Sequence, residues 1–355
     1  MKGRGATFDP ANRYREHTRE AFDDGWAQDE EALPPLRTTV SVQRARTIIA
    51  HNDSPDVPFS QSINPYQGCE HGCIYCYARP THAYLDLSPG LDFETRLFAK
   101  PEAAALLRAE LAKPRYRCDP IALGTNTDPY QPIEREWKIT RAVLEVLAEC
   151  EHPFTIVTKS ARIERDIDLI APMAAKKMAR VYLSVTTLDR ELARKLEPRA
   201  SAPSRRLEAV TNLAAAGIPV GVMVAPVIPQ LNDRDLEAIL GEAASRGATS
   251  AGYVVLRLPL EVAPLFRAWL ETHYPDRAAH VMSLVAAMRG GRDYESAFGA
   301  RMRGRGIFAE LIEKRFANAC RRLGLARGRG QSDLDTTRFH PPRSDAPQGD
   351  LFAAS

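Results

Sequence analysis

Short apolar segments alternate with amphipathic helical segments through the middle of the chain, and this alternation limits the possible folds more than any other feature. The expected strands lie within residues 59–69, 120–126, 154–160, 180–187, 219–229 and 249–260, and the clearest helices lie at 139–150, 167–178, 203–217 and 233–247. Repeated strand–helix units predict a parallel sheet. Six strands without a glycine-rich dinucleotide-binding turn favour an α/β fold, a partial (β/α)6 TIM-type barrel, over a doubly wound sheet.

The segments on either side of this region differ in character, and they divide the chain into four parts. Residues 1–60 carry many charges and few periodic apolar positions, which predicts an N-terminal arm packed on the outside of a core barrel at 61–260. Residues 261–335 are predicted to form a helical, basic extension. Residues 336–355 are rich in proline and polar residues, as expected of a flexible tail.

Composition and charge exclude several classes of protein. Hydrophobic residues make up 44% and charged residues 26% of the 355 residues, which is typical of a globular chain. No apolar run approaches the roughly 18–20 residues of a membrane span, and the N-terminus lacks the apolar core of a secretory signal. We therefore expect a soluble cytoplasmic protein with no membrane partner.

A cluster of three cysteines stands out from three scattered ones. Cys69, Cys73 and Cys76 have the spacing C-x3-C-x2-C. Three thiolates on one compact loop can hold three irons of a [4Fe–4S] cluster and leave the fourth iron open to a substrate or cofactor. A structural zinc site is an alternative, but it needs four ligands, and neither His71 nor His82 has the usual spacing. Unligated cysteines are the remaining alternative.

The cysteine spacing with Tyr75 before the third cysteine, followed by strand–helix units, resembles the radical S-adenosylmethionine (SAM) superfamily. The resemblance implies that the open iron binds the amino and carboxylate groups of SAM. It also implies that one electron from the cluster splits SAM into methionine and a 5′-deoxyadenosyl radical, which abstracts hydrogen from a substrate. An external electron donor is then required. By the same resemblance, Tyr75 lies beside the adenine.

Other segments are similar to the spore photoproduct lyase-like group of this superfamily, and most of all to its uncharacterised bacterial branch. They include SINPYQGCEHGC at 62–73, SPGLDFET at 88–95, GTNTDPYQPIE at 124–134, VTKS at 157–160, SVTT at 184–187, LEPRA at 196–200 and THYPDR at 272–277. The similarity covers roughly residues 40–340.

Polar residues follow four of the expected strands, at 125–128, 158–159, 184–187 and 225–226. Parallel barrels place their active sites at this end of the strands. By resemblance to the lyases, the carboxylate, ribose and adenine of SAM are held by Thr127, Lys159, Ser184 and the backbone of Ala225. Asp128 is expected to accept a hydrogen bond from the methionine amine or the ribose. Ordinary turn chemistry is the alternative for any one serine or threonine.

One position departs from the lyases. They carry a hydrogen-donating cysteine where this chain has Thr125, whose O–H bond is too strong for that role. Cys118 lies about 20 Å away along the strand, at the other end of the barrel. Photoproduct repair by the same mechanism is therefore not expected. Tyr77 and Tyr130 are candidates for a radical relay, with packing at the barrel mouth as the alternative.

A basic segment and a short C-terminal peptide suggest a nucleic-acid partner. Residues 289–329 contain eleven Lys and Arg against four Asp and Glu, with Phe298, Phe308 and Phe316 between them. A solvated helix face is the alternative. Gln348–Phe352 (QGDLF) resembles the peptide by which bacterial DNA enzymes bind the replication sliding clamp.

These features predict a radical SAM enzyme acting on DNA in a repair-like reaction. Radical modification of RNA or a small molecule is one alternative. A non-catalytic, metal-stabilised nucleic-acid-binding module is another.

Overall fold

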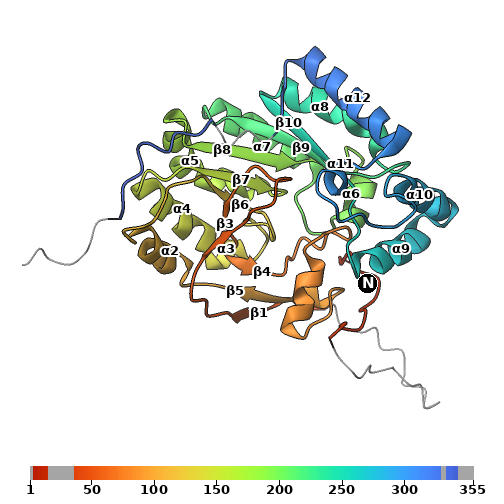
Figure 1. Cartoon of the computed structure of the whole chain (residues 1–355), viewed down its shortest axis with the longest axis horizontal. Coiled ribbons are helices and arrows are strands. Elements are labelled where there is room, and N and C mark those ends of the chain that lie inside the picture. Colours follow the sequence, from red (N-terminus) through yellow and green to blue (C-terminus); the bar gives the residue numbers. More distant parts are fainter. Residues whose placement is uncertain (1–2, 15–35, 329–332, 343–355) are drawn as a thin grey trace, which may run out of the picture.

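The computed structural model describes residues 3–14, 36–328 and 333–342 (Figure 1). Its main sheet has the strand order β11-β10-β9-β8-β7-β6-β3-β2. The strands of this sheet are β2 (Ile49–His51), β3 (Gln61–Ile63), β6 (Ile121–Leu123), β7 (Phe154–Thr158), β8 (Ala179–Ser184), β9 (Val220–Val227), β10 (Ser250–Val255) and β11 (Ala326–Arg327). The strands from β3 to β10 run parallel, so the predicted partial barrel is confirmed. At its edges, β2 is antiparallel to β3 and β11 is parallel to β10.

Helices cover the outer face of this sheet, because the connections between successive parallel strands contain them. In chain order they are α2 (Ala103–Leu111), α3 (Glu134–Trp137), α4 (Ile139–Glu149), η2 (Ala161–Asp166), α5 (Ile167–Ala175), α6 (Arg190–Leu196), α7 (Pro203–Ala215), η3 (Asp233–Asp235) and α8 (Leu236–Ser245). Figure 1 shows α4, α5, α7 and α8 outside the strands. The strands are consequently apolar on both faces; β9 is buried at every position except Ala225.

Strand register brings the ends of the central strands to one edge of the sheet. Thr158 of β7 pairs with Leu183 of β8, and Ser184 pairs with Met223 of β9. The loops that follow these strands therefore meet at the carboxyl end of the barrel.

The first expected strand, at 59–69, is divided in the structure. Pro65 interrupts the segment after β3, because proline has no N–H for the sheet. The next residues form β4 (Tyr66–Gln67), which belongs to a second, three-stranded sheet in the order β1-β5-β4. That sheet also contains β1 (Thr39–Val42) and β5 (Arg96–Ala99), and the nearby short helices are η1 (Arg79–Leu85) and α1 (Asp92–Thr95).

A few residues of the N-terminal arm are buried against the rest of the protein, although much of its described part is exposed. The backbone N–H groups of Gly5 and Ala6 both donate to the buried carboxylate of Glu94, at 2.9 Å. A Cβ on Gly5 would meet the carbonyl oxygen of Gly72 at 1.8 Å. The arm therefore packs directly against the cysteine loop, which local sequence patterns did not indicate.

The C-terminal extension is helical, as predicted. Its helices are α9 (Val262–His273), α10 (Pro275–Ala287), α11 (Ala300–Arg303) and α12 (Gly306–Leu323). α12 packs on α8, where Arg315 pairs with Glu237 at 2.7 Å, and buried Phe316 contacts the ring of Tyr253. None of the helices in the described ranges is both long and apolar enough to span a membrane.

The beginning of the expected flexible tail differs from the prediction. Phe339 packs against the rings of Tyr116 and His152, and His340 donates its N–H to the carbonyl of Cys150 at 3.0 Å. In the sequence, only the aromatic residue Phe339 among polar neighbours indicated that this segment packs on the protein. The clamp-like peptide at 348–352 lies outside the described residues.

Candidate active site

The cysteine loop follows β4 and turns sharply twice. Gly72 has a φ of +67°, and a Cβ there would lie 2.7 Å from the Glu94 carboxylate, so glycine is required at this position. The N–H groups of Gly72 and Cys76 donate to the carbonyls of Cys69 and Cys73, at 3.3 and 3.1 Å. These tight turns bring three cysteines into one short loop.

A buried arginine holds the cysteine loop through hydrogen bonds to its backbone. The Arg79 guanidinium donates to the carbonyls of Cys73 and Gly72 and pairs with Glu94 at 2.5 Å. Both charged side chains are fully buried. Since a buried ion pair is lost only at a high energetic cost, Arg79 and Glu94 hold the loop in one conformation.

The three thiols suit a thiolate-binding metal cluster. All are free cysteines; Cys69 and Cys73 are buried, and Cys76 is partly exposed. Burial raises the pKa of each thiol. Backbone hydrogen bonds from Asp128 to Cys69, and from Ala78 and Arg79 to Cys76, favour the thiolates and act against this effect.

The arrangement differs from that of a single-ion site. Among the described residues, no three His, Cys, Asp or Glu side chains are grouped as ligands of one metal ion. A [4Fe–4S] cluster uses one cysteine per iron and so does not need the three sulfurs to converge on one point. The loop therefore fits the cluster expected from its spacing.

A cavity of about 550 Å³ opens at the carboxyl end of the barrel, beside the cysteine loop. Six of the predicted site residues line it: Cys73, Tyr75, Cys76, Lys159, Ser184 and Ala225. They come from the cysteine loop, the end of β7, the end of β8 and the interior of β9. Residues 52–64, Gly124–Asn126 and the segment around Arg257 and Arg301 complete much of the wall. The sequence pattern thus predicted the location of the cavity, and its size suits a cofactor with part of a substrate.

Hydrogen bonds connect the predicted cofactor residues. Lys159 Nζ donates to Ser184 Oγ at 3.0 Å, and Ser184 Oγ donates to the carbonyl of Ala225 at 3.3 Å. The Lys159 ammonium also lies 5.8 Å from the centre of the Tyr75 ring. A cation, a hydroxyl and a backbone carbonyl thus lie together on the wall, as recognition of a carboxylate and a nucleoside would require.

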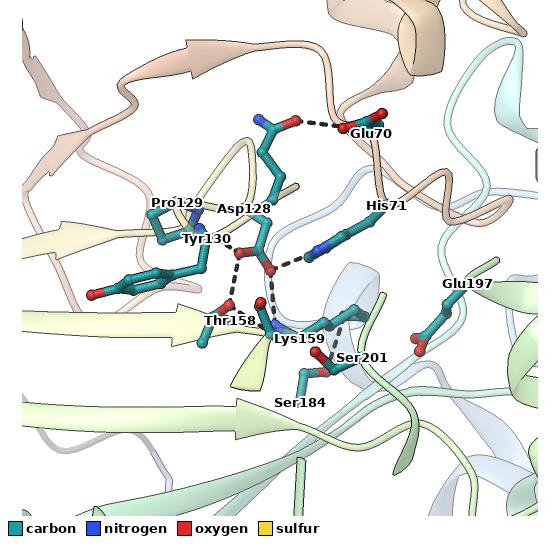
Figure 2. Close-up of polar contacts among 12 residues, drawn as sticks. Glu70, His71, Asp128, Pro129, Tyr130, Thr158, Lys159, Ser184, Glu197 and Ser201 are labelled. Carbon is teal, nitrogen blue, oxygen red and sulfur yellow. Dashed lines mark hydrogen bonds and ion pairs between the residues drawn. The ribbon is translucent and has the colours of Figure 1, made fainter. Parts of the chain in front are cut away.

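Thr127 and Asp128 lie behind the cavity wall. Thr127 is buried and donates its hydroxyl to the carbonyl of Tyr66 at 3.0 Å. Figure 2 shows the Asp128 carboxylate between His71 and the end of β7, where it accepts hydrogen bonds from Thr158 Oγ1 and the Lys159 N–H. The two residues thereby join the cysteine loop to the strand that carries Lys159, which favours a positioning role over direct contact with a cofactor.

Electrostatics keep Asp128 ionised. Burial alone would raise the pKa of its carboxyl group, but His71, with Nδ1 3.4 Å away, and the hydrogen bonds from β7 hold the pKa at about 2. The carboxylate therefore remains a hydrogen-bond acceptor at neutral pH.

Glu197 is a site-supporting residue that the residue predictions missed. Its buried carboxylate accepts hydrogen bonds from Tyr75, Thr186 and Arg206. Burial acts to raise the pKa of Glu197, but Arg206 and Lys159 outweigh it and hold the pKa at about 2. Glu197 lies in the LEPRA segment noted in the sequence, but only the fold shows that its partner is Tyr75.

Asn64 was also missed, although it belongs to the segment SINPYQGCEHGC. Its Oδ1 accepts hydrogen bonds from the N–H groups of Asn126 and Thr127, at 3.0 and 3.4 Å. A single side chain from the end of β3 thus shapes the loop after β6. Thr125, which stands in place of the lyase cysteine, lines the cavity, whereas Cys118 precedes β6 and lies at the opposite end of that strand.

The two tyrosines considered for a radical relay have different surroundings. Tyr130 is fully buried and donates to Asp166 at 3.0 Å, which matches the packing alternative. Tyr77 is 46% exposed, lines the cavity and donates to the Thr125 carbonyl.

Comparisons with known proteins agree with this geometry. The profile of the family described as "Radical SAM superfamily" matches residues 63–243. Uncharacterised proteins of Mycobacterium bovis and Mycobacterium tuberculosis are 40% identical over 279 residues, covering 74% of this chain and 82% of theirs. A protein of Methanocaldococcus jannaschii is 28% identical over 227 residues, covering 64% and 81%.

Solved structures resemble the fold. A spore photoproduct lyase complexed with dinucleoside spore photoproduct has a TM-score of 0.57 at 18% identity, covering 81% of this chain and 80% of the lyase. A mutant of that lyase with bound AdoMet and dinucleoside spore photoproduct has the same TM-score, identity and coverage. At this identity the likeness concerns the fold alone.

Proposed function

This chain belongs to the radical SAM superfamily, and from this premise we propose that it abstracts hydrogen from DNA in a repair-like or modifying reaction. It is a radical SAM enzyme, and its cofactors are a [4Fe–4S] cluster and SAM. When bound, these cofactors supply the 5′-deoxyadenosyl radical that abstracts hydrogen. We also propose that the protein acts in the cytoplasm.

Some of the protein's residues would hold the cofactors, and others would position the loops that carry those residues. Cys69, Cys73 and Cys76 would hold the cluster, and the cavity that two of them line supports this assignment. Tyr75, Lys159, Ser184 and the Ala225 backbone would bind SAM. Thr127 and Asp128 would position the loops that carry them. An external electron donor would supply the electron.

The charge of the cavity wall is the observation that carries the DNA proposal. Lys159, Arg257 and Arg301 line the cavity, and none of its wall residues, all in the described part of the chain, is acidic. Arg301 is paired with Asp56, so Lys159 and Arg257 contribute most of the positive charge. An electropositive wall favours a polyanionic substrate. The lyase of similar fold, whose structure holds a dinucleoside photoproduct, adds a precedent within this architecture.

Two observations bear on the alternatives. Several basic side chains of the 289–329 segment form ion pairs within the protein, such as Arg303 with Glu313 at 2.9 Å, and Phe316 is buried. These contacts argue against a continuous nucleic-acid-binding surface on the extension, for DNA and RNA alike, so the proposal rests on the cavity wall. Thr125 also separates the reaction from that of the lyases, because no thiol occupies its place.

A reconstitution experiment tests the proposed function. The protein is loaded with iron and sulfide anaerobically, reduced with dithionite, and assayed for 5′-deoxyadenosine from SAM with and without duplex DNA. We expect about four irons per chain and product formation that DNA stimulates. Cys73→Ala should lose iron and product, whereas Cys118→Ala, a cysteine outside the loop, should retain both.

Different results would refute the cysteine assignment and the DNA substrate. Full iron content in Cys73→Ala would refute the cysteine assignment. Product that DNA leaves unchanged, while RNA or a small molecule stimulates it, would refute the DNA substrate.

We also propose that Gln348–Phe352 binds the sliding clamp. Clamp capture by the wild type should be lost when Leu351 and Phe352 are both changed to alanine. Unchanged capture by that variant would contradict the assignment.

A further inference from the structure

Arg257 follows the end of β10 and lines the same cavity as the predicted SAM residues of β7 and β8. Among the described residues, the partners of its guanidinium are a thioether, a hydroxyl and an aromatic ring. Nη1 lies 3.3 Å from Met302 Sδ, Nη2 lies 3.4 Å from the hydroxyl of Tyr294, and the group sits 5.1 Å from the centre of the Tyr77 ring. Its buried Nε has no hydrogen-bond partner in the described part of the chain.

The acidic side chains nearby in sequence or space are engaged elsewhere. Asp293 pairs with Arg267 at 2.5 Å, and the Glu295 carboxylate accepts the N–H of Ala297 at 3.0 Å. Asp56 pairs with Arg301. Within the described ranges, Arg257 therefore has no carboxylate partner.

A second guanidinium adds to the positive charge. Arg289 is buried and donates to three backbone carbonyls, those of Val255, Leu256 and Ala300. Burial, followed by the charge of Arg257, lowers the pKa of Arg289 to about 10, so it remains a cation at neutral pH. The three carbonyls hold the Arg289 guanidinium, and Glu295 partly offsets its charge. Among the described residues Arg257 has no comparable compensation, so an anion bound in the cavity would stabilise it.

We propose that Arg257 binds a phosphate group of a nucleotide unit in the substrate. The inference deepens the proposed function and rests on it. Arginine matches phosphate because its planar guanidinium can donate two parallel hydrogen bonds. Tyr77, nearly half exposed beside it, provides an aromatic surface of the kind that nucleotides contact. Arg301 lines the same wall, but its charge is already compensated by Asp56.

Binding to the reconstituted protein tests this assignment. The probe is a fluorescein-labelled single-stranded oligonucleotide of about ten nucleotides, followed by anisotropy at several salt concentrations. Arg257→Gln should weaken binding about tenfold or more and reduce the log–log salt slope by about one. Arg267→Gln removes one positive charge from an exposed ion pair and should change the affinity by less than about twofold. Arg257→Lys, which keeps the charge without the planar fork, should fall between the wild type and Arg257→Gln.

Small ligands separate the phosphate from the rest of the nucleotide. Thymidine 5′-monophosphate should compete with the probe in the wild type and lose this ability in Arg257→Gln, whereas thymidine should compete weakly with either protein. Binding of the monophosphate without the oligonucleotide would support Arg257 as a phosphate site while refuting DNA as the substrate.

Three results would overturn the inference. The first is equal oligonucleotide affinity in Arg257→Gln and Arg267→Gln. The second is loss of SAM binding, measured by equilibrium dialysis, with oligonucleotide binding retained in Arg257→Gln. The third is a wild type that binds neither the oligonucleotide nor the monophosphate. Unchanged thermal unfolding of the variants shows that their fold is intact.

Discussion

The Glu197–Arg206 ion pair gives a sharp test of how the cavity is supported. Both side chains are 1% exposed, and Arg206 also donates to the carbonyls of Ser184 and Ser201, at 2.9 and 2.7 Å. Glu197→Gln removes the negative charge but keeps the side-chain size, so Arg206 becomes a buried cation without a counter-charge. Breaking such a pair typically costs about 3–5 kcal/mol.

The lowered pKa of Glu197 gives a similar estimate of the loss in unfolding free energy. Arg206 and Lys159 outweigh burial and lower the pKa from 4.5 to about 2, which corresponds to about 3 kcal/mol of stability at neutral pH. Because the folded-state pKa is the lower one, this stabilisation is present above pH 4.5 and is lost as the pH falls toward 2. We therefore expect Glu197→Gln to reduce the free energy of unfolding by about 3 kcal/mol at pH 7.

Urea unfolding followed by circular dichroism measures this loss, and an exposed pair on the same helix provides the control. Arg205 and Glu208 lie on the surface of α7 with side chains about half exposed, so Glu208→Gln should cost no more than about 0.5 kcal/mol. Combining Glu197→Gln with Arg206→Met should cost less than the sum of the single changes, because the unpaired cation is removed. If Glu197→Gln unfolds at the same urea concentration as Glu208→Gln, the reasoning is refuted.

Two further predictions concern parts of the fold away from the cavity. His152 is fully buried, and burial is the main cause that lowers its pKa to about 4. Between pH 7 and pH 5 the wild type should therefore lose about 2 kcal/mol more stability than His152→Gln. Urea unfolding of both proteins at the two pH values measures this difference, and equal losses would contradict the prediction. Gly5→Ala should destabilise the protein by about 1–3 kcal/mol because its Cβ would overlap the Gly72 carbonyl, whereas Gly241→Ala, in a helix with open space around it, should stabilise by up to about 1 kcal/mol. Thermal unfolding compares the two glycine variants, and a Gly5→Ala protein as stable as the wild type would show that the arm does not pack on the cysteine loop.

Periodic, local features of this protein were predictable from the sequence. The strands of the barrel appeared as short apolar runs because both faces of a parallel sheet are buried. The cysteine spacing identified the loop, since three thiolates within a few residues can serve a single cluster. Parallel register then implied that Lys159, Ser184 and Ala225 would meet at the carboxyl end of the barrel, and all three line the cavity.

The supporting contacts were not predictable in this way. The N–H groups of Gly5 and Ala6 donate to Glu94, which is almost 90 residues away in the sequence. Asp128 lies behind the cavity wall and accepts a hydrogen bond from the Lys159 N–H. Glu197 and Arg257 are both charged residues near the ends of elements. Glu197 is buried and paired, whereas Arg257 lines the cavity with no carboxylate partner among the residues that the structure describes.

The sequence by itself determined the alternation of strands and helices in the barrel, the cysteine loop and the end of the barrel at which the cavity lies. These features follow from side-chain periodicity and from spacing within one loop. Only the tertiary structure decided which charged groups neutralise one another and which remain available to a ligand. That outcome depends on distances between residues far apart in the chain, because a charge is compensated by whatever the fold brings within a few ångströms of it.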